Sequence, residues 1–386
     1  MKELLKENFI KYFKKEPSYY YFSPGRVNLI GEHIDYNGGM VFPFGVTLGI
    51  YAALLERCDN KIRVISEKFN EEPIIFRIGD EKKTGDFTDY IKGVIKIISE
   101  KVKEKFSKGF DLYITSTLPA ASGLSSSAAL ELLVSHIIND LYDLKISDLD
   151  LVLASQKAER EFVLVNCGIM DQFAIGMSEE DKAILLNTNT LEYHYVDFNL
   201  DNATLIIINT NKPRALVESK YNERRSECEK ALAILNKKHD KDNLCSFNLD
   251  ELNSCKDKLG DTLYRRCHHV ITENARVYEF KEALEKHDLL KLGKLLTASH
   301  KSLKEDYEVT GINLDTICEA LDSYHIVLGS RMTGAGFGGC AIALFNTTDL
   351  LKIDEVMEKV GIIYKEITGL ELSYYVTKSS RRTGRI

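Results

Sequence analysis

Segments with the composition of strands alternate with segments that have helical spacing of apolar residues, and this alternation constrains the fold most strongly. The predicted strands are 42–55, 61–66, 110–116, 205–209 and 340–345. The predicted helices are 89–103, 151–165, 218–237, 264–286 and a long apolar segment from 128 onward. Residues 205–209 (LIIIN) and 340–345 (CAIALF) are apolar enough for strands buried on both faces. The sequence therefore predicts a protein that mixes α and β structure.

The length of 386 residues predicts two domains, or three, at about 150 residues each. The clearest boundary lies in the polar stretch Asn187–Asn202, which precedes the second set of strands. We therefore expect an N-terminal domain over residues 1–190 and a C-terminal domain over residues 191–386. A second polar segment, Lys237–Asp261, is predicted to be an exposed connection or insertion.

Charge and cysteine content exclude several classes of protein. The 51 basic and 58 acidic residues give a formal charge of −7, so nucleic acid is not an expected partner. The eight cysteines are scattered without a CxxC pair, which argues against a zinc site or a disulfide scaffold. No stretch reaches the roughly 18 apolar residues that span a bilayer, and residues 1–17 lack the features of a secretory signal. We expect a soluble protein of the cytoplasm with reduced thiols.

The segment Ser23–Gly39 concentrates charged side chains between a Pro-Gly pair and an Asn-Gly-Gly sequence. Closely spaced acidic groups beside a histidine suit a polyhydroxylated sugar, because carboxylates accept hydroxyl protons in strong hydrogen bonds. Glu32, His33 and Asp35 are the candidates, and Arg26 could stabilise charge on a transferring phosphoryl group. The alternative is a solvated turn, opened by Pro-Gly, with incidental charges.

The segment Leu118–Glu131 is rich in small residues and runs from a predicted strand into a predicted helix. Free backbone amides and the positive end of a helix dipole make such a segment a candidate phosphate cradle. Its serine hydroxyls could bind phosphate oxygens or a magnesium ion. The segment is not the common P-loop, which requires a lysine that is missing here. A helix N-cap with two surplus serines is the alternative.

Two further segments are candidates for chemistry. In Cys167–Phe173, Asp171 lies in an apolar setting, and an Arg26–Asp171 pair could tune a general base, although a lone aspartate is also a common helix cap. Glu159 lies twelve residues earlier and could reach a metal ion. The segment Arg331–Cys340 is a glycine-rich turn before a strand, which is a weak signal by itself.

Taken together, these motifs resemble galactokinases of the GHMP kinase superfamily, in the order and over nearly the length that the family shows. The matching motifs are GRVNLIGEHIDYN, GLSSSAALE, CGIMDQF and MTGAGFGGC. Three further stretches are similar to that family: SKYNERRSEC, ITENARV and SHKSLKEDYEVT. The resemblance implies an α+β fold of two domains, an N-terminal domain of the ribosomal-protein-S5 type and a ferredoxin-like C-terminal domain, with the active site between them.

The resemblance also implies a role for each matching residue. Asp171 would accept the proton of the anomeric hydroxyl, with Arg26 stabilising the transition state. The residues implied to bind the sugar are Glu32, His33, Ile34, Asp35, Gly168 and Tyr221. The residues implied to bind ATP are Ser66, Ala121, Ser122, Gly123, Leu124, Ser125, Ser126 and Ser127, and those at a magnesium ion are Ser127 and Glu159. Ala121 departs from the family pattern, because a glycine is frequent at that position.

The reaction implied by the resemblance is transfer of the γ-phosphoryl group of ATP to O1 of α-D-galactose. Mg²⁺ is the implied cofactor, and galactose and MgATP are the implied ligands. The expected oligomeric state is a monomer. An N-acetylgalactosamine kinase is one alternative, which would need extra room beside C2 of the sugar. A non-catalytic regulator that binds galactose and ATP is another. Superfamily members that act on mevalonate or homoserine lack the EHIDYN stretch.

Overall fold

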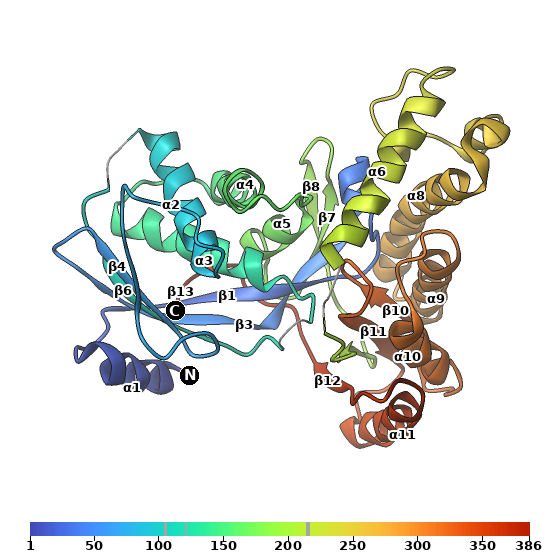
Figure 1. Cartoon of the computed structure of the whole chain (residues 1–386). Coiled ribbons are helices and arrows are strands. Elements are labelled where there is room, and N and C mark those ends of the chain that lie inside the picture. The colour runs from blue at the N-terminus through green and yellow to red at the C-terminus, as the bar shows by residue number, and fades with distance from the viewer. Residues whose placement is uncertain (104–105, 120–121, 214–216) are drawn as a thin grey trace.

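The computed structural model describes residues 1–386 except 104–105, 120–121 and 214–216 (Figure 1). Its strands form three sheets, and the helices lie on their faces. The strands are β1 (Tyr19–Asn28), β2 (Met40–Val41), β3 (Pro43–Glu56), β4 (Lys61–Ser66), β5 (Ile74–Arg77), β6 (Phe110–Ser116), β7 (Lys182–Asn187), β8 (Tyr193–Asp197), β9 (Thr204–Asn209), β10 (Val327–Thr333), β11 (Cys340–Phe345), β12 (Ser373–Val376) and β13 (Gly384–Arg385). The helices are α1 (Lys2–Phe13), α2 (Thr88–Val102), α3 (Ser126–Leu141), α4 (Asp148–Ala158), α5 (Met170–Gly176), α6 (Val217–Leu235), α7 (Leu249–Asn253), α8 (Lys256–Glu285), α9 (Leu289–Glu305), α10 (Ile312–Asp322) and α11 (Leu350–Thr368).

A six-stranded sheet in the order β13-β1-β3-β6-β4-β5 forms the N-terminal part. Helices α2 to α5 cover one face, and α1 covers the other (Figure 1). The two faces have separate apolar cores, because Leu5 and Phe9 of α1 pack against Ala53, Ile65 and Tyr113 in a cluster of their own. Strand β3, which contacts both α1 and α3, is therefore covered on both faces.

Pro24 and Gly25 lie inside strand β1, so the turn predicted from this pair is wrong. The pairing of β1 with β3 shifts register between the two residues, as in a β-bulge. A Cβ on Gly25 would lie 2.8 Å from the backbone oxygen of Leu124, so only glycine lets β1 approach the segment before α3 this closely. The bulge thus brings Arg26, the next residue, to that segment.

The C-terminal part contains a four-stranded antiparallel sheet in the order β10-β11-β9-β12. Helices α6 to α10 connect β9 to β10, and α11 connects β11 to β12. This order and these connections form the βαββαβ arrangement of a ferredoxin-like domain. The predicted α+β class is confirmed, and so are strands 61–66, 110–116 and 340–345 at their predicted bounds. Among the described residues, no helix is both long and apolar enough to cross a membrane.

The end of the chain returns to the N-terminal sheet, where β13 pairs with β1 (Figure 1). Thr383 and Ser23 hydroxyls lie 2.7 Å apart, and Ser178 donates a hydrogen bond of 2.7 Å to the backbone oxygen of Ser380. The boundary predicted at residue 190 falls in the hairpin between β7 and β8, which pair with each other. The division of the chain into 1–190 and 191–386 stays a prediction, and the return of residues 377–386 had no signal in the sequence.

The prediction of an exposed connection over Lys237–Asp261 is confirmed for most of its residues, but the segment also has a buried side. Leu244, Phe247 and Leu252 are buried, and Asn248 forms a capping box with Glu251 at the start of α7. The apolar residues are too sparse for a helical or strand-like pattern, so their burial depends on tertiary packing against α8. This segment also supports residues 29–39, called the signature loop below, because the side chains of Asn243 and Cys245 lie against Gly38 and Gly39.

Removal of residues 379–386 is expected to destabilise the protein by about 3 kcal/mol or more, because several buried hydrogen bonds are lost together. Thr383→Val, which removes one hydroxyl partner of Ser23, is the matched control and is expected to cost about 1 kcal/mol. The measurement is thermal unfolding followed by circular dichroism. A truncated protein that melts at the wild-type temperature would contradict this account of the C-terminal return.

Candidate active site

Arg26 joins three segments that are distant in the sequence. Its Nε and Nη2 donate hydrogen bonds of 2.8 Å each to the two carboxylate oxygens of Asp171, at the start of α5. Its Nη1 donates a hydrogen bond of 2.6 Å to the backbone oxygen of Gly123. The Ser125 hydroxyl donates to Asp171 Oδ2 at 2.5 Å. Such bidentate, charge-assisted pairing fixes the carboxylate in one orientation.

Ser125 precedes α3 with a φ of 61°, in the left-handed region that costs a residue with a side chain free energy. This conformation aims the Ser125 hydroxyl at Asp171 rather than at the amides of the helix, and the structure gives Ser125 no side-chain capping bond. The alternative in which these serines act mainly as a helix cap is therefore not favoured at Ser125.

A cavity of about 360 Å³ lies beside the Arg26–Asp171 pair, within the size range of small-molecule sites. Side chains and backbone from β1, the signature loop, α2, α3, α5, α6 and the glycine-rich turn before β11 line it. The lining residues are Arg26, Glu32, His33, Asp35, Tyr90, Ser127, Glu159, Val165, Asn166, Cys167, Gly168, Met170, Asp171, Tyr221, Asn222, Gly334 and Ala335.

Glu32 anchors the signature loop to the glycine-rich turn. Its Oε1 accepts hydrogen bonds from the hydroxyl of Thr333 at 2.9 Å and from the amide of Gly334 at 2.8 Å, and it pairs with Arg331 at 2.9 Å. Both charged side chains are almost fully buried, at 1% and 0% exposure. One carboxylate oxygen is thus held by the protein, and the carboxylate still lines the cavity.

Glu273 of α8 supports the same loop from behind. Its Oε1 accepts the amide of Gly31 at 2.9 Å and the hydroxyl of Ser299 at 2.7 Å. Burial raises the pKa of Glu273, but the charges of Arg276, His269 and Arg331 outweigh it and lower that pKa to about 2. A permanently ionised carboxylate therefore holds the backbone from which Glu32 and His33 project.

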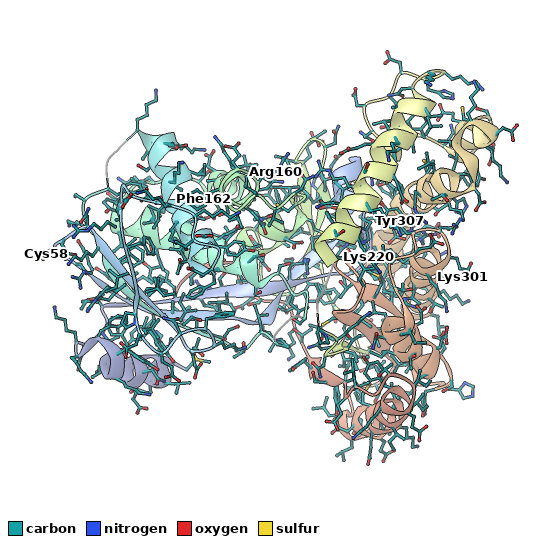
Figure 2. All side chains as sticks on the ribbon, viewed as in Figure 1. Cys58, Arg160, Phe162, Lys220, Lys301 and Tyr307 are labelled. Atoms are coloured by element: carbon teal, nitrogen blue, oxygen red, sulfur yellow. The ribbon has the colours of Figure 1, made fainter. Side chains whose placement is uncertain are left out.

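His33 has a φ of 62° and lines the cavity with a ring that is almost fully buried. Burial, and secondarily the nearby His269, lower the pKa of His33 to about 3, so the ring is neutral at pH 7. Its Nδ1 lies 2.9 Å from the Tyr36 hydroxyl, which lies 2.8 Å from that of Tyr307. Figure 2 shows Tyr307 next to α6, on the C-terminal side of the molecule. Among the described residues, none forms a hydrogen bond with the buried Nε2 atom of His33.

Asp35 packs directly on the backbone of Gly168, where a Cβ would collide with the Asp35 carboxylate. Burial, then the charges of Asp171 and Glu32, raise the pKa of Asp35 to about 7. The Tyr221 ring lies near His33 and Tyr36, with ring centroids 5.7 Å and 5.3 Å away. The carboxylates of Glu32, Asp35 and Asp171 and the rings of His33 and Tyr221 thus form a wall rich in hydrogen-bond acceptors.

Glu159 begins a π-helical turn, Glu159–Val163, that extends α4. Single π-helical turns are common at functional sites. The Glu159 carboxylate, at the start of this one, accepts hydrogen bonds from the side chains of Cys167, Gln172 and Ser127. Burial, then the charge of Asp171, raise the pKa of Glu159 to about 7. A buried carboxylate beside a hydroxyl, without a cationic partner among the described residues, suits Mg²⁺, which needs few protein ligands when phosphates supply others. Among the described residues, no group of three or more His, Cys, Asp and Glu could hold a metal unaided.

Comparison with known proteins agrees with this geometry. The galactokinase galactose-binding signature matches residues 7–55, and the N-terminal and C-terminal domains of GHMP kinases match residues 89–179 and 280–364. A galactokinase of Clostridium perfringens (strain SM101 / Type A) is 48% identical over 96% of both chains. One of Enterococcus faecalis is 46% identical over 97% of both. The chain belongs to the galactokinase family.

Solved structures agree with membership of the galactokinase family. The structure of Lactococcus lactis galactokinase complexed with galactose has a TM-score of 0.95 and 43% identity, covering 100% of this chain and 99% of that one. The Methanococcus jannaschii mevalonate kinase is only 19% identical, with a TM-score of 0.68, and shares the fold. The predicted two-domain GHMP kinase fold is confirmed.

Within this family fold, the structure brings most of the predicted site residues into one cavity. Those that line it are Arg26, Glu32, His33, Asp35, Ser127, Glu159, Gly168, Asp171 and Tyr221. Gly123 and Ser125 do not line the cavity, but they hydrogen-bond to Arg26 and Asp171, which do. Ile34 is buried beside Gly39 and does not line the cavity. Ser66, Ser122, Leu124 and Ser126 do not line it either, and Ala121 is outside the described residues. The roles of these residues stay predictions.

No role was predicted for four other residues that line the cavity: Tyr90, Val165, Asn166 and Asn222. Tyr90 is near the start of α2, and the other three are in segments that only the tertiary fold brings together. Adjacency to Tyr221 was the one available signal, and it concerned Asn222 alone.

Gly168→Ala is expected to weaken galactose binding at least about 100-fold, because the added methyl group displaces the Asp35 carboxylate. Gly361→Ala in α11 is the matched control, since a Cβ there meets open space and alanine favours a helix. Isothermal titration calorimetry with galactose measures both variants. Wild-type affinity in Gly168→Ala would show that the contact with Asp35 does not shape the site.

Proposed function

We propose that this protein is a galactokinase that transfers the γ-phosphoryl group of ATP to O1 of α-D-galactose, giving galactose 1-phosphate and ADP. The observation that carries the proposal is the Arg26–Asp171 pair at the cavity, facing Glu32, His33 and Asp35. The relative from Lactococcus lactis was solved with galactose, and its fold matches this chain over the full length.

The sugar is held by groups that match its hydroxyls. The carboxylates of Glu32 and Asp35 accept hydroxyl protons, and the neutral His33 ring offers its Nε2. Buried polar groups that lose their partner are costly, so this wall favours a ligand that carries a hydroxyl at each position. Tyr221 and the Gly168 backbone close the wall beside Asp35.

Asp171 receives the proton of the O1 hydroxyl as O1 bonds to the γ-phosphorus and the bond to the departing ADP oxygen breaks. Arg26 holds the Asp171 carboxylate in position with two hydrogen bonds and offers positive charge to the transferring group. Phosphoryl transfer depends mainly on positioning of the reacting groups and on stabilisation of the charge on the transferring group. The Arg26–Asp171 pair supplies both.

Residues 121–127 hold the triphosphate in this proposal, with the N-terminus of α3 behind it and Ser66 at the nucleotide. Ser127 and Glu159 would hold a magnesium ion, which would offset the phosphate charge. A cytoplasmic location and a monomeric state complete the proposal, and the absence of disulfides among the eight cysteines fits a reducing compartment.

The proposal is tested by ADP release with galactose, glucose, N-acetylgalactosamine and mevalonate. Turnover with galactose well above the others is expected. Faster turnover with N-acetylgalactosamine would favour the alternative sugar kinase, and binding of galactose and ATP without ADP release would favour the non-catalytic regulator.

Asp171→Asn is expected to lower kcat by about 100-fold or more, because the amide cannot take up a proton, while it keeps the shape of the side chain. Galactose affinity, measured by calorimetry, serves as the control for a preserved site. A fall in kcat below about tenfold, worth ~1.4 kcal/mol, would mean that Asp171 positions O1 without acting as a base.

Galactose affinity is expected to fall as the pH drops below about 7, because the Asp35 carboxylate becomes protonated with a pKa of about 7 and can no longer accept freely. From pH 8 to pH 6 the expected loss is about tenfold. The same raised pKa makes the folded protein bind this proton more tightly than the unfolded chain, so the contribution of Asp35 to stability decreases as pH rises toward 7.

Calorimetry without ATP and Mg²⁺ keeps metal binding at Glu159 out of the measured affinity. Glu159 also has a pKa of about 7, so a variant of Asp35 is needed to assign the pH dependence. Asp35→Asn is the control and is expected to bind galactose more weakly with little change over this pH range. A wild-type affinity that is constant from pH 8 to pH 6 would contradict the assignment of Asp35.

A further inference from the structure

Two polar side chains behind the cavity wall, Glu131 and Gln172, have no part in the mechanism above and form a cluster with Glu159. Glu131 comes from α3, Gln172 from α5, and Glu159 from the end of α4. Glu131 and Gln172 are fully buried at 0% exposure, and Glu159 is 6% exposed on its cavity side. Burial of two carboxyl groups this close together needs a specific arrangement of protons and donors.

The Gln172 amide nitrogen bridges the two carboxyl groups. It donates one hydrogen bond of 2.5 Å to Glu159 Oε2 and another of 3.0 Å to Glu131 Oε2. A primary amide has two N–H donors, so both are used. The opposite orientation of the amide would turn its oxygen toward two carboxyl groups, which is unfavourable.

Two oxygens of this cluster, Glu131 Oε1 and Gln172 Oε1, are buried and receive no hydrogen bond from a described residue. The Glu131 carboxyl group and the Gln172 amide, which carry these oxygens, are already joined by the hydrogen bond from Gln172 Nε2 to Glu131 Oε2. A proton on Glu131 would supply the missing donor, since a carboxylic acid and a primary amide form a ring of two hydrogen bonds. Each group then gives one hydrogen bond and accepts one, and neither oxygen is left unpaired.

The surroundings of Glu131 favour its neutral form. Burial, then the nearby Glu159, raise the pKa of Glu131 well above its ordinary value. In the described part of the chain, no cationic side chain forms an ion pair with Glu131 or is among the groups that act on its pKa. An isolated ionised carboxylate in such a place is too costly to persist.

We propose that Glu131 is a neutral acid paired with the Gln172 amide, and that this pair makes Gln172 a positioning residue for Glu159, beside Cys167 and Ser127. The assignment of Glu159 to the metal rests on the proposed function, whereas the acid–amide pair does not. An amide in this position orients the Glu159 carboxylate without cancelling its charge, which an arginine or lysine would do. Glu159 therefore keeps its negative charge available for a cation in the cavity.

Infrared spectroscopy of the ligand-free protein at about pH 8 tests the neutral acid directly. Subtraction of the spectrum of Glu131→Gln from that of the wild type is expected to leave the carbonyl band of a protonated carboxyl group. Glutamine at 131 can accept from the Gln172 amide and donate to its oxygen, so this variant is expected to keep the wild-type melting temperature and Mg²⁺ dependence. A carboxylate band in the difference spectrum would overturn the proposal, as would a large drop in melting temperature.

Gln172→Met tests positioning, because methionine fills a similar volume and offers no donor. The Mg²⁺ concentration for half-maximal ADP release is expected to rise about tenfold or more, as for other groups that orient a metal ligand. Calorimetric affinity for galactose is expected to stay at the wild-type value. Unchanged Mg²⁺ dependence in this variant, with an altered dependence in Glu159→Gln, would overturn the positioning role and leave the proposed function standing.

Glu159→Gln separates failure of this inference from failure of the proposed function. Unchanged Mg²⁺ dependence in Glu159→Gln would remove Glu159 from the metal site, and the positioning role of Gln172 would fail with it. The infrared difference spectrum would still decide whether Glu131 and Gln172 form the acid–amide pair.

Discussion

The bidentate pair between Arg26 and Asp171 organises the rest of the site. One guanidinium group, from a bulge in β1, orients the Asp171 carboxylate and holds the backbone oxygen of Gly123 before α3. Ser125 completes the arrangement from a left-handed conformation that this network maintains. Because Arg26 is only 4% exposed, its contacts are made at low dielectric and have a fixed geometry. The guanidinium group of Arg26 thus fixes the positions of β1, the serine-rich segment before α3, and α5 relative to one another.

The opposite wall of the cavity depends on buried charges of the C-terminal part. Arg331 pairs with Glu32, and Glu273 holds the amide of Gly31, so the signature loop is fixed by β10 and α8 although it follows β1 in the chain. The family-like stretch ITENARV contains Glu273. The stretch SHKSLKEDYEVT contains Ser299 and Tyr307, which hydrogen-bond to Glu273 and Tyr36. These stretches act through the loop and do not line the cavity.

Sequence patterns correctly predicted the features that depend on neighbouring residues in the chain, such as apolar strands and the residues of short motifs. Strands 61–66 and 110–116 were correct because their burial follows a simple apolar pattern, and the residues at the Arg26–Asp171 pair were identified from motifs. The Pro24–Gly25 turn was wrong because a bulge against β3 overrides the local preference of these residues. Contacts between distant segments, which no local pattern encodes, account for the features that were missed. These features are the burial of Leu244 and Phe247, the pairing of β13 with β1, and the presence of Tyr90 at the cavity.

The distribution of charge at the cavity limits what can bind there. Glu32, Asp35, Glu159 and Asp171 line it, whereas Arg26 is the sole arginine or lysine among the described lining residues. Repulsion among these carboxylates contributes to the raised pKa values of Asp35 and Glu159. A neutral ligand with many hydroxyl donors relieves this excess of acceptors, whereas a bare polyphosphate would increase the repulsion. Under the proposed function, a divalent cation that arrives with the nucleotide would offset that repulsion at Glu159. The Glu159 carboxylate must then keep its negative charge, so a hydrogen bond from the neutral Gln172 amide suits this position better than an ion pair with a cationic side chain.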